Sequence, residues 1–343
     1  MSPFFFSGVC SIVTSALVSG ALSRYHGRFA LLDRPNARSL HTRAVPRSGG
    51  LGILSGIALG AFVSGQYNGL ASPGWGGLAV ALVALVSLAD DVRHLPALVR
   101  ILVHFVAAGL LVYTAGFMPK VLNVFPGIAL LEPAWLMRLL CLFIVVWMVN
   151  LYNFMDGMDG FAGGMAVIGF GSFALLGALA GSPAYVAAAL VVALATVGFL
   201  PFNFPPARLF MGDVGSGSLG FLAAGFMLWA ERDRLFPLWM GALVFSPFIV
   251  DATWTVVRRT SEGQKPWKAH REHYYQRLVQ LGWGHRRTVL WAYTLMLICT
   301  SLALAAFCFT STGVQSGLLG LSAATYLALM AYINALERRR SSR

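Results

Sequence analysis

Long apolar stretches alternate with short polar ones along the whole chain. Windows of about 20 residues, the length of helix that crosses the hydrocarbon core of a bilayer, identify about eleven apolar segments. These segments cover residues 4–23, 49–66, 76–89, 101–117, 134–151, 162–180, 184–201, 216–230, 236–257, 288–309 and 316–336. The third and the eighth are short, so a count of about ten is the alternative. The pattern predicts an all-α, polytopic integral membrane protein with about 11 transmembrane helices.

Composition supports a membrane protein and changes how the charge is interpreted. Of the 343 residues, 57% are hydrophobic and 11% are charged, which is more apolar surface than a soluble fold of this length needs to bury. A formal net charge of +12 would suggest a nucleic-acid partner in a soluble protein. In a membrane protein the charge instead raises the question of which side carries the Lys and Arg residues. We therefore expect no nucleic-acid partner.

The basic residues distribute unevenly when the chain is threaded back and forth across a bilayer. With the loops after the first, third, fifth, seventh and ninth segments on the side of the C-terminus, all but four of the 25 Lys and Arg residues lie on that side. The exceptions are Lys120, Arg138, Arg232 and Arg234. Because basic loops remain in the cytoplasm, we expect a periplasmic N-terminus and a cytoplasmic C-terminus.

The residues that could perform chemistry gather on that same side. Cytoplasmic loops at about 24–48, 90–100, 151–164, 201–217 and 258–287 carry most of the Asp, Asn and His residues of the polar segments. The sequence shows no internal repeat and no soluble domain, so residues 1–343 are expected to form a single integral-membrane domain. The clustering predicts an active site at the cytoplasmic surface of the membrane.

The strongest local pattern lies in the loop at about 151–164. Asn150, Asn153, Asp156 and Asp159 alternate there with glycines at a helix end. Carboxylate and amide oxygens on a backbone that can turn tightly suit a hard divalent cation. In the alternative interpretation, these residues only cap the ends of helices.

Two further acidic motifs lie at the ends of apolar segments. Asp213 lies among glycines at a helix start, where backbone N–H groups can approach phosphate oxygens while the carboxylate holds a metal. Asp90 and Asp91 are adjacent, and repulsion between neighbouring carboxylates favours a proton acceptor or nucleophile near neutral pH. The alternatives are a helix cap for the first motif and a solvated pair, neutralised by Arg93 and Arg100, for the second.

A late loop carries His270, His273 and Arg277 in a basic run. Such side chains can clamp the pyrophosphate of a nucleotide sugar. The two histidines also allow a zinc interpretation, but no Cys or third clustered His completes such a site. Asp251 lies inside an apolar segment, where an acid is costly, so it is a functional candidate or else the ion-pair partner of a neighbouring Arg.

With these motifs in this order, the chain resembles the polyprenyl-phosphate N-acetylhexosamine-1-phosphate transferase family, glycosyltransferase family 4, which includes the WecA and MraY relatives. The first loop adds to the match, because it fits the WecA-like pattern at Asp33, Pro35, Arg38, His41, Pro46, Gly49 and Gly50. The resemblance implies about ten or eleven transmembrane helices in the bacterial inner membrane, often in a homodimer, with a cytoplasmic groove open to the lipid.

The resemblance also implies a reaction and residue roles. A sugar 1-phosphate would pass from a UDP-N-acetylamino sugar to undecaprenyl phosphate, with release of UMP and a requirement for Mg²⁺, Mn²⁺ being an alternative cofactor. Asn153 and Asp213 would be the metal ligands. The catalytic acids would be Asp90, Asp91, Asp156 and Asp159. Substrate binding would fall to Arg38, His41, Asn150, Gly212, His270, His273 and Arg277.

Departures from the family pattern bear on the donor and the pathway. Ser39 stands where a Lys is usual, and Tyr275 and Gln276 stand in a run where many relatives carry His. The amino-acid sequence of the late loop is more similar to that of a WbpL-like subgroup, whose members start O-antigen chains. Two alternatives stay open: an MraY-type transferase for peptidoglycan precursors, and an ion-coupled secondary transporter. A transporter would place polar residues near the midplane of the membrane rather than at its edge.

Overall fold

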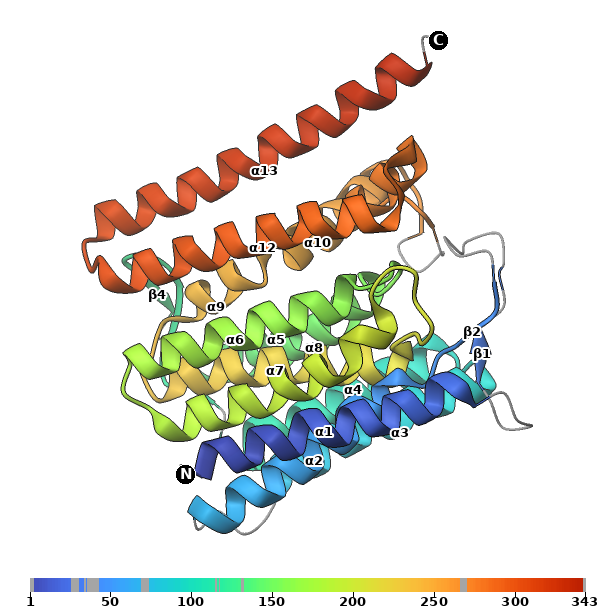
Figure 1. Cartoon of the computed structure of the whole chain (residues 1–343). Helices are drawn as coiled ribbons and strands as arrows, with labels where there is room; N and C mark the ends of the chain where they lie inside the picture. The colour runs from blue at the N-terminus through green and yellow to red at the C-terminus, as the bar shows by residue number, and fades with distance from the viewer. Residues whose placement is uncertain are drawn as a thin grey trace.

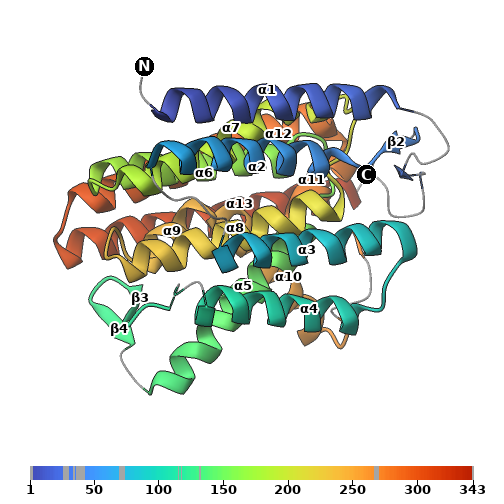
Figure 2. The ribbon, with the colours of Figure 1, turned by 90° about the horizontal axis from the view of Figure 1, so that it is seen from below.

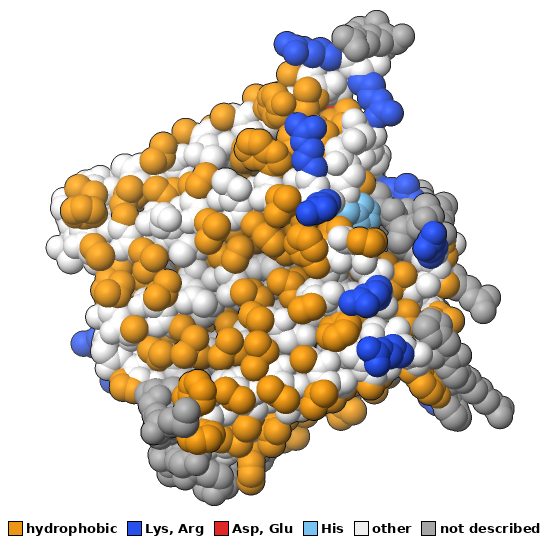
Figure 3. Space-filling view, viewed as in Figure 1, with side chains coloured by type: hydrophobic (Ala, Val, Ile, Leu, Met, Phe, Trp, Pro, Cys, Tyr) orange, Lys and Arg blue, Asp and Glu red, His pale blue; other side chains and the backbone are white. Residues whose placement is uncertain are grey.

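In the computed structural model, long helices run roughly side by side in one bundle (Figure 1, Figure 2). The structure describes residues 3–25, 31–33, 35, 43–68, 74–114, 116, 118–130, 133–265 and 270–341. The two termini lie at opposite ends of the bundle (Figure 1). Figure 3 shows hydrophobic side chains spread over one face of the bundle, with most of the visible Lys and Arg side chains toward the end that bears the C-terminus.

The helices are α1 (Pro3–Arg24), α2 (Gly49–Asn68), α3 (Gly74–Arg93), α4 (Ala97–Gly109), α5 (Ala134–Phe154), α6 (Phe161–Leu179), α7 (Pro183–Asn203), α8 (Gly212–Arg232), α9 (Leu238–Val244), α10 (Ser246–Ser261), α11 (Tyr274–Leu278), α12 (Gly284–Cys308) and α13 (Thr312–Ser341). The π-helical turns η1 (Leu110–Thr114) and η2 (Val279–Trp283) continue α4 and α11. Short antiparallel hairpins pair β1 (Leu32–Asp33) with β2 (Val45–Pro46) and β3 (Leu122–Phe125) with β4 (Ile128–Leu130).

The predicted apolar segments coincide with these helices. Each range falls on one helix, except that 101–117 continues from α4 into η1 and that 236–257 falls on α9 and α10. Within the described residues, six helices are long and apolar enough to cross a membrane, or seven if the bent pair α9 and α10 counts as one span. The all-α, polytopic fold class is confirmed. The count of about 11 spans and the orientation of the termini stay predictions.

The segment 236–257 contains a sharp bend that hydropathy did not reveal. The axes of α9 and α10 differ by 85°. Pro247 lies in the first turn of α10, directly after the bend. Proline has no N–H group to continue the hydrogen bonds of a preceding helix, yet it fits the first turn of a new one. The bend directs α10 toward the late loop.

Small residues allow α1, α2 and α7 to pack closely. A Cβ atom added to Gly56 of α2 would lie 2.5 Å from the carbonyl oxygen of Ser11 in α1. One added to Gly198 of α7 would lie 2.4 Å from the carbonyl oxygen of Ile12. Helices in lipid associate through such close backbone approach, because lipid tails are as apolar as the side chains. This packing brings the starts and ends of distant helices together.

Candidate active site

The acidic motifs meet at one end of the bundle. Asp90 and Asp91 lie in the last turn of α3, Asn153 lies in the last turn of α5, and Asp213 lies in the first turn of α8. Asp156 follows in the loop between α5 and α6. This end also carries the C-terminus and the hairpin of β1 and β2 (Figure 1). The structure therefore brings together residues that the sequence separates widely.

Glycines hold the starts of α2 and α8 against each other. The backbone N–H of Gly50 donates to the carbonyl of Met211 at 2.7 Å. A Cβ atom at Gly50 would lie 2.2 Å from the backbone nitrogen of Gly215. Gly212 has a φ of +71°, and a Cβ there would lie 2.3 Å from the carbonyl oxygen of Arg47. Only glycine fits these positions without strain, and the result is a fixed location for Asp213.

Arg100 links two of the carboxylates. Its Nη1 lies 2.5 Å from Oδ2 of Asp90 and 3.6 Å from Oδ2 of Asp213. The other oxygen of Asp90 accepts the backbone N–H of Leu95 at 2.7 Å. The side chains of Asn153 and Asp90 also lie next to the Asp213 carboxylate. The predicted metal ligands, Asn153 and Asp213, are thus direct neighbours.

Asp91 faces a different set of groups. Its Oδ2 accepts the backbone N–H of Val214 at 3.5 Å, and its Oδ1 lies 3.5 Å from Nη1 of Arg47. Arg47 also donates to the main-chain carbonyl of Asp91. The sequence suggested Arg93 and Arg100 as the neutralising residues, but only Arg100 binds the pair, and Arg47 takes the second role. Arg47 belongs to the first loop, and its place beside the Asp91 carboxylate was not predicted.

Negative charge exceeds positive charge here. The acidic cluster consists of Asp90, Asp91, Asp156 and Asp213, and the cations paired with it are those of Arg47 and Arg100. Burial, reinforced by the charges of Asp213 and Asp91, raises the pKa of Asp156 well above its usual value. A cation beyond the two Arg side chains would stabilise such a cluster.

The donor set suits a hard divalent ion. Among the described residues there is no group of three or more His, Cys, Asp or Glu side chains that could hold a metal by themselves. Magnesium, however, is usually bound by one or two carboxylates together with waters and substrate phosphates. The neighbouring oxygens of Asn153 and Asp213, open to partial solvent contact, fit that mode.

Asp159 faces away from the acidic cluster. Its Oδ2 accepts the backbone N–H of Ala207 at 3.0 Å, and its Oδ1 lies 3.1 Å from Nδ1 of His285 in α12. The next residue is held as well, because the N–H of Gly160 donates to Asn203 at 3.0 Å. Asp159 therefore ties the loop after α5 to the segment before α8 and to α12. The predicted catalytic role of Asp159 stays a prediction, and nothing in the spacing pointed to His285.

Other predicted substrate-binding residues have varied surroundings. The Asn150 amide donates to the carbonyl of Val146 in its own helix at 2.7 Å. Gly212 lies at the junction already described. Arg38 and His41 lie outside the described residues, so their predicted roles stay predictions.

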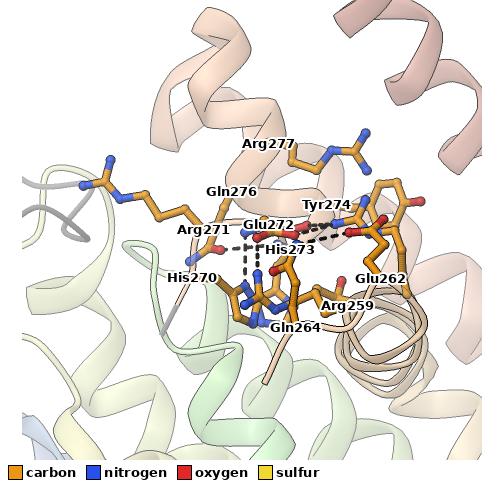
Figure 4. Close-up of polar contacts among 12 residues, drawn as sticks. Arg259, Glu262, Gln264, His270, Arg271, Glu272, His273, Tyr274, Gln276 and Arg277 are labelled. Atoms are coloured by element: carbon orange, nitrogen blue, oxygen red, sulfur yellow. Dashed lines mark hydrogen bonds and ion pairs between the residues drawn. The ribbon is translucent and has the colours of Figure 1, made fainter. Parts of the chain in front are cut away.

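The late loop packs on the end of α5 through His273 and Phe154, and Figure 4 shows the polar contacts within this loop. Glu272 makes ion pairs with both Arg258 and Arg259 at the end of α10. The ring of His273 stacks on Phe154, with centroids 6.4 Å apart, and lies 4.8 Å from the ring of His270. Burial, together with His273 and then Arg259, lowers the pKa of His270 to about 4. His270 is therefore neutral at physiological pH.

Arg277 has a different environment from the one expected. Its guanidinium donates to Glu337 at 2.7 Å and to Asn334 at 2.5 Å, both in α13. It also lies 4.5 Å from the centre of the Tyr274 ring. In this arrangement Arg277 fastens the last helix to the late loop, and it is not among the groups that contact the acidic cluster.

The structure is that of a polytopic membrane protein, a helical bundle that gathers acids, an amide and guanidinium groups at one end. A family model described as glycosyl transferase family 4 matches residues 75–231, which include Asp90, Asp91, Asn153 and Asp213.

Relatives found by sequence similarity are also transferases that use related substrates, according to their names. The chain is 32% identical over 319 residues to decaprenyl-phosphate N-acetylglucosaminephosphotransferase of Mycobacterium tuberculosis (strain CDC 1551 / Oshkosh), covering 83% of this chain and 78% of that protein. It is 29% identical to a probable undecaprenyl-phosphate N-acetylglucosaminyl 1-phosphate transferase of Bacillus subtilis (strain 168), covering 84% and 81%. It is 32% identical to a phospho-N-acetylmuramoyl-pentapeptide-transferase of Synechococcus sp. (strain JA-3-3Ab), covering 88% and 90%.

The chain belongs to glycosyl transferase family 4, and it is a multi-span membrane enzyme of that family. The transporter alternative thereby loses its support. The matches do not separate the WbpL-like subgroup from other members.

Proposed function

We propose that this enzyme transfers an N-acetylamino-sugar 1-phosphate from a UDP-sugar to undecaprenyl phosphate and releases UMP, at the cytoplasmic face of the bacterial inner membrane. The observation that carries the proposal is the contact between Asn153 and Asp213 beside the Arg100 and Asp90 pair. The names of the relatives, which describe polyprenyl-phosphate sugar-phosphate transferases, support the reaction class.

Asn153 and Asp213 would hold Mg²⁺ together with oxygens of the donor diphosphate. When bound, the ion supplies charge neutralisation that lets two anionic substrates approach each other. Arg100 has the geometry to add to this effect, because its guanidinium already lies between Asp90 and Asp213. Removal of water from such a site strengthens each of these interactions.

The reaction is a displacement at phosphorus. An oxygen of the lipid phosphate forms a bond to the phosphorus that carries the sugar, and the bond from that phosphorus to the bridging oxygen breaks. The electron pair of the broken bond leaves with UMP. The product is a lipid diphosphate that carries the sugar.

Within the acidic pair, Asp91 is the better group to orient or deprotonate the acceptor. Both oxygens of Asp90 accept hydrogen bonds, one from Leu95 and one from Arg100. Oδ1 of Asp91 has no hydrogen-bond partner among the described atoms, although the Arg47 guanidinium lies 3.5 Å away. This oxygen is buried beside Arg47, whose guanidinium would attract an acceptor phosphate to that side of the cluster.

The pathway proposed is the initiation of O-antigen or a related surface polysaccharide. This choice of pathway rests on the amino-acid sequences of the first and late loops. The second candidate is transfer of a peptide-bearing sugar phosphate for peptidoglycan, and the observation that favours it is the 32% identity to a phospho-N-acetylmuramoyl-pentapeptide-transferase over 88% of this chain.

The deciding experiment uses the purified full-length chain with undecaprenyl phosphate, Mg²⁺ and a panel of UDP-sugars. The panel contains UDP-N-acetylglucosamine, UDP-linked 6-deoxy N-acetylamino sugars and UDP-N-acetylmuramoyl-pentapeptide. Release of UMP with an amino sugar, and none with the pentapeptide, is the expected result. Release with the pentapeptide alone would replace the first candidate by the second, and no release with any donor would refute both.

A further inference from the structure

Asp251 is buried in α10, with 9% of its surface exposed, and the reaction described above does not use it. Its Oδ1 accepts the backbone N–H of Tyr274 at 2.9 Å and the hydroxyl of Thr255 at 3.2 Å. Its Oδ2 accepts the backbone N–H of Tyr275 at 3.2 Å. Oδ1 also lies 3.5 Å from Nδ1 of His273. One carboxylate therefore faces four groups, three of which belong to the late loop.

The neighbouring Arg residues do not explain why a buried acid is present at position 251, because they pair with another residue. Arg258 and Arg259, the Arg residues that follow Asp251 in α10, both bind Glu272. This second contact fastens the late loop to the end of α10, one residue before His273 (Figure 4). The Asp251 carboxylate therefore contacts mainly the late loop, at Tyr274, Tyr275 and His273.

His273 connects Asp251 to the active site. Its ring stacks on Phe154, the residue after Asn153. The hydroxyl of Tyr275 donates to the carbonyl of Phe154 at 3.2 Å, and a Cβ atom at Gly157 would lie 2.3 Å from that hydroxyl. The late loop thus packs directly on the loop that follows α5. A change in the orientation of His273 would therefore alter the packing of Phe154, the residue next to Asn153.

The two nitrogens of the His273 ring have different surroundings. Nδ1 is buried and makes no hydrogen bond with the described residues, and Oδ1 of Asp251 lies 3.5 Å from it. Nε2 lies at the other edge of the ring and has no hydrogen-bond partner among the described residues. A carboxylate at one ring nitrogen fixes which nitrogen carries the proton and how the ring is turned.

We propose that Asp251 is a positioning residue, which holds His273 through Nδ1 and through the start of α11, so that Nε2 is directed at the diphosphate of the sugar donor. This inference rests on the proposed function for the identity of the donor. The contacts of Asp251 with the late loop do not depend on it.

The test compares Asp251→Asn with His273→Asn and with the double variant. Asparagine replaces one of the two carboxylate oxygens with an NH2 donor, so the N–H group of Tyr274 or of Tyr275 loses its acceptor. Because a hydrogen bond to a charged group contributes about 1.5–3 kcal/mol, we expect KM for the UDP-sugar to rise about tenfold or more in Asp251→Asn, while KM for undecaprenyl phosphate stays unchanged. We expect the double variant to be no worse than His273→Asn.

Asp233→Asn is the matched control, because Asp233 pairs with Trp229 and Arg232 at the end of α8, away from the late loop. It should leave both KM values unchanged. Equal increases in both KM values for Asp251→Asn, or losses that add up in the double variant, would show that Asp251 only supports the fold and would overturn the proposal.

A readout without turnover separates this inference from the proposed function. Hydrogen exchange at the amides of Tyr274 and Tyr275, and the ¹⁵N shifts of the His273 ring, should change in Asp251→Asn and not in Asp233→Asn. If the unaltered enzyme released no UMP from any donor while these signals changed, the proposed function would fail and the hold of Asp251 on His273 would stand. Unchanged signals would refute that hold, whatever the enzyme's activity.

Discussion

The side chain of Asn153 lies next to the carboxylate of Asp213, although Asn153 lies at the end of α5 and Asp213 at the start of α8. The contact exists because α8 packs closely on α5, where a Cβ atom added to Gly220 would lie 2.5 Å from the carbonyl oxygen of Met148. It places an amide oxygen and a carboxylate side by side at the end of the bundle, beside a cluster whose negative charge exceeds its positive charge.

The first prediction concerns Asp213 itself. Asp213→Asn removes the charge that a divalent ion would meet, and we expect the rate of UMP release to fall by at least about a hundredfold, the scale of losing one group that stabilises the transition state. We also expect Mg²⁺ to lose its stabilising effect on the thermal unfolding of the variant in detergent. Asp233→Asn should behave as the unaltered enzyme in both assays. Full activity in Asp213→Asn would exclude Asp213 as a metal ligand.

Arg100 gives the second prediction. Its guanidinium separates the carboxylates of Asp90 and Asp213, so Arg100→Met leaves these like charges without their shared cation. We expect kcat/KM to fall about tenfold or more, because breaking a charge-assisted hydrogen bond costs about 1.5–3 kcal/mol. Arg93→Met is the control, since Arg93 is exposed at the same end of α3 and lies outside the ion pairs of the cluster. Equal losses in the two variants would argue against a specific role for Arg100.

Asp156 gives a prediction about pH. Its pKa is raised in the folded enzyme, mainly by burial and then by Asp213, so the folded state binds a proton more tightly than the unfolded chain does. The stability that this proton contributes is fully present below the ordinary value of 3.8 and is lost as the pH rises through the raised value. Without metal, the melting temperature should therefore fall as the pH rises from about 5 to 8.

The variant Asp156→Asn binds no proton and should show a shallower fall over the same range. Thermal unfolding in detergent with a chelator, for both proteins at each pH, measures the difference. Identical slopes would mean that Asp156 is not the group responsible.

Hydropathy and charge were sufficient to locate the helices and to gather the acidic motifs on one side. Asp90, Asn153 and Asp213 each lie at the end of an apolar segment, and a helix that crosses a bilayer can only present its ends to water. Their meeting at one end of the bundle follows from the alternating direction of the spans. The motif spelling around them was specific enough to indicate the family.

The sequence did not show which residues contact the predicted site side chains. Arg277 looked like a phosphate ligand, yet it binds Glu337, which lies in the last helix. Asp159 looked like its neighbour Asp156, yet it pairs with His285. Such choices depend on which helices become neighbours and on how far each side chain can reach, and neither quantity is encoded in local periodicity.

The last prediction addresses the glycine junction that positions Asp213. A Cβ atom at Gly50 would lie 2.2 Å from the nitrogen and 2.6 Å from the Cα of Gly215, so Gly50→Ala must push α2 and α8 apart. We expect a loss of stability of about 1–3 kcal/mol, the usual cost of overpacking, and a fall in activity that exceeds what the loss of folded protein explains. The matched control is Gly171→Ala in α6, because a Cβ there meets nothing within 4 Å. Alanine favours a helix over glycine by about 0.8–1.0 kcal/mol, so this variant should be as stable as the unaltered enzyme or more so. Thermal unfolding and UMP release, measured on equal amounts of folded protein, check both effects. If Gly50→Ala retained full activity and stability, the close approach of α2 and α8 would not be what fixes Asp213.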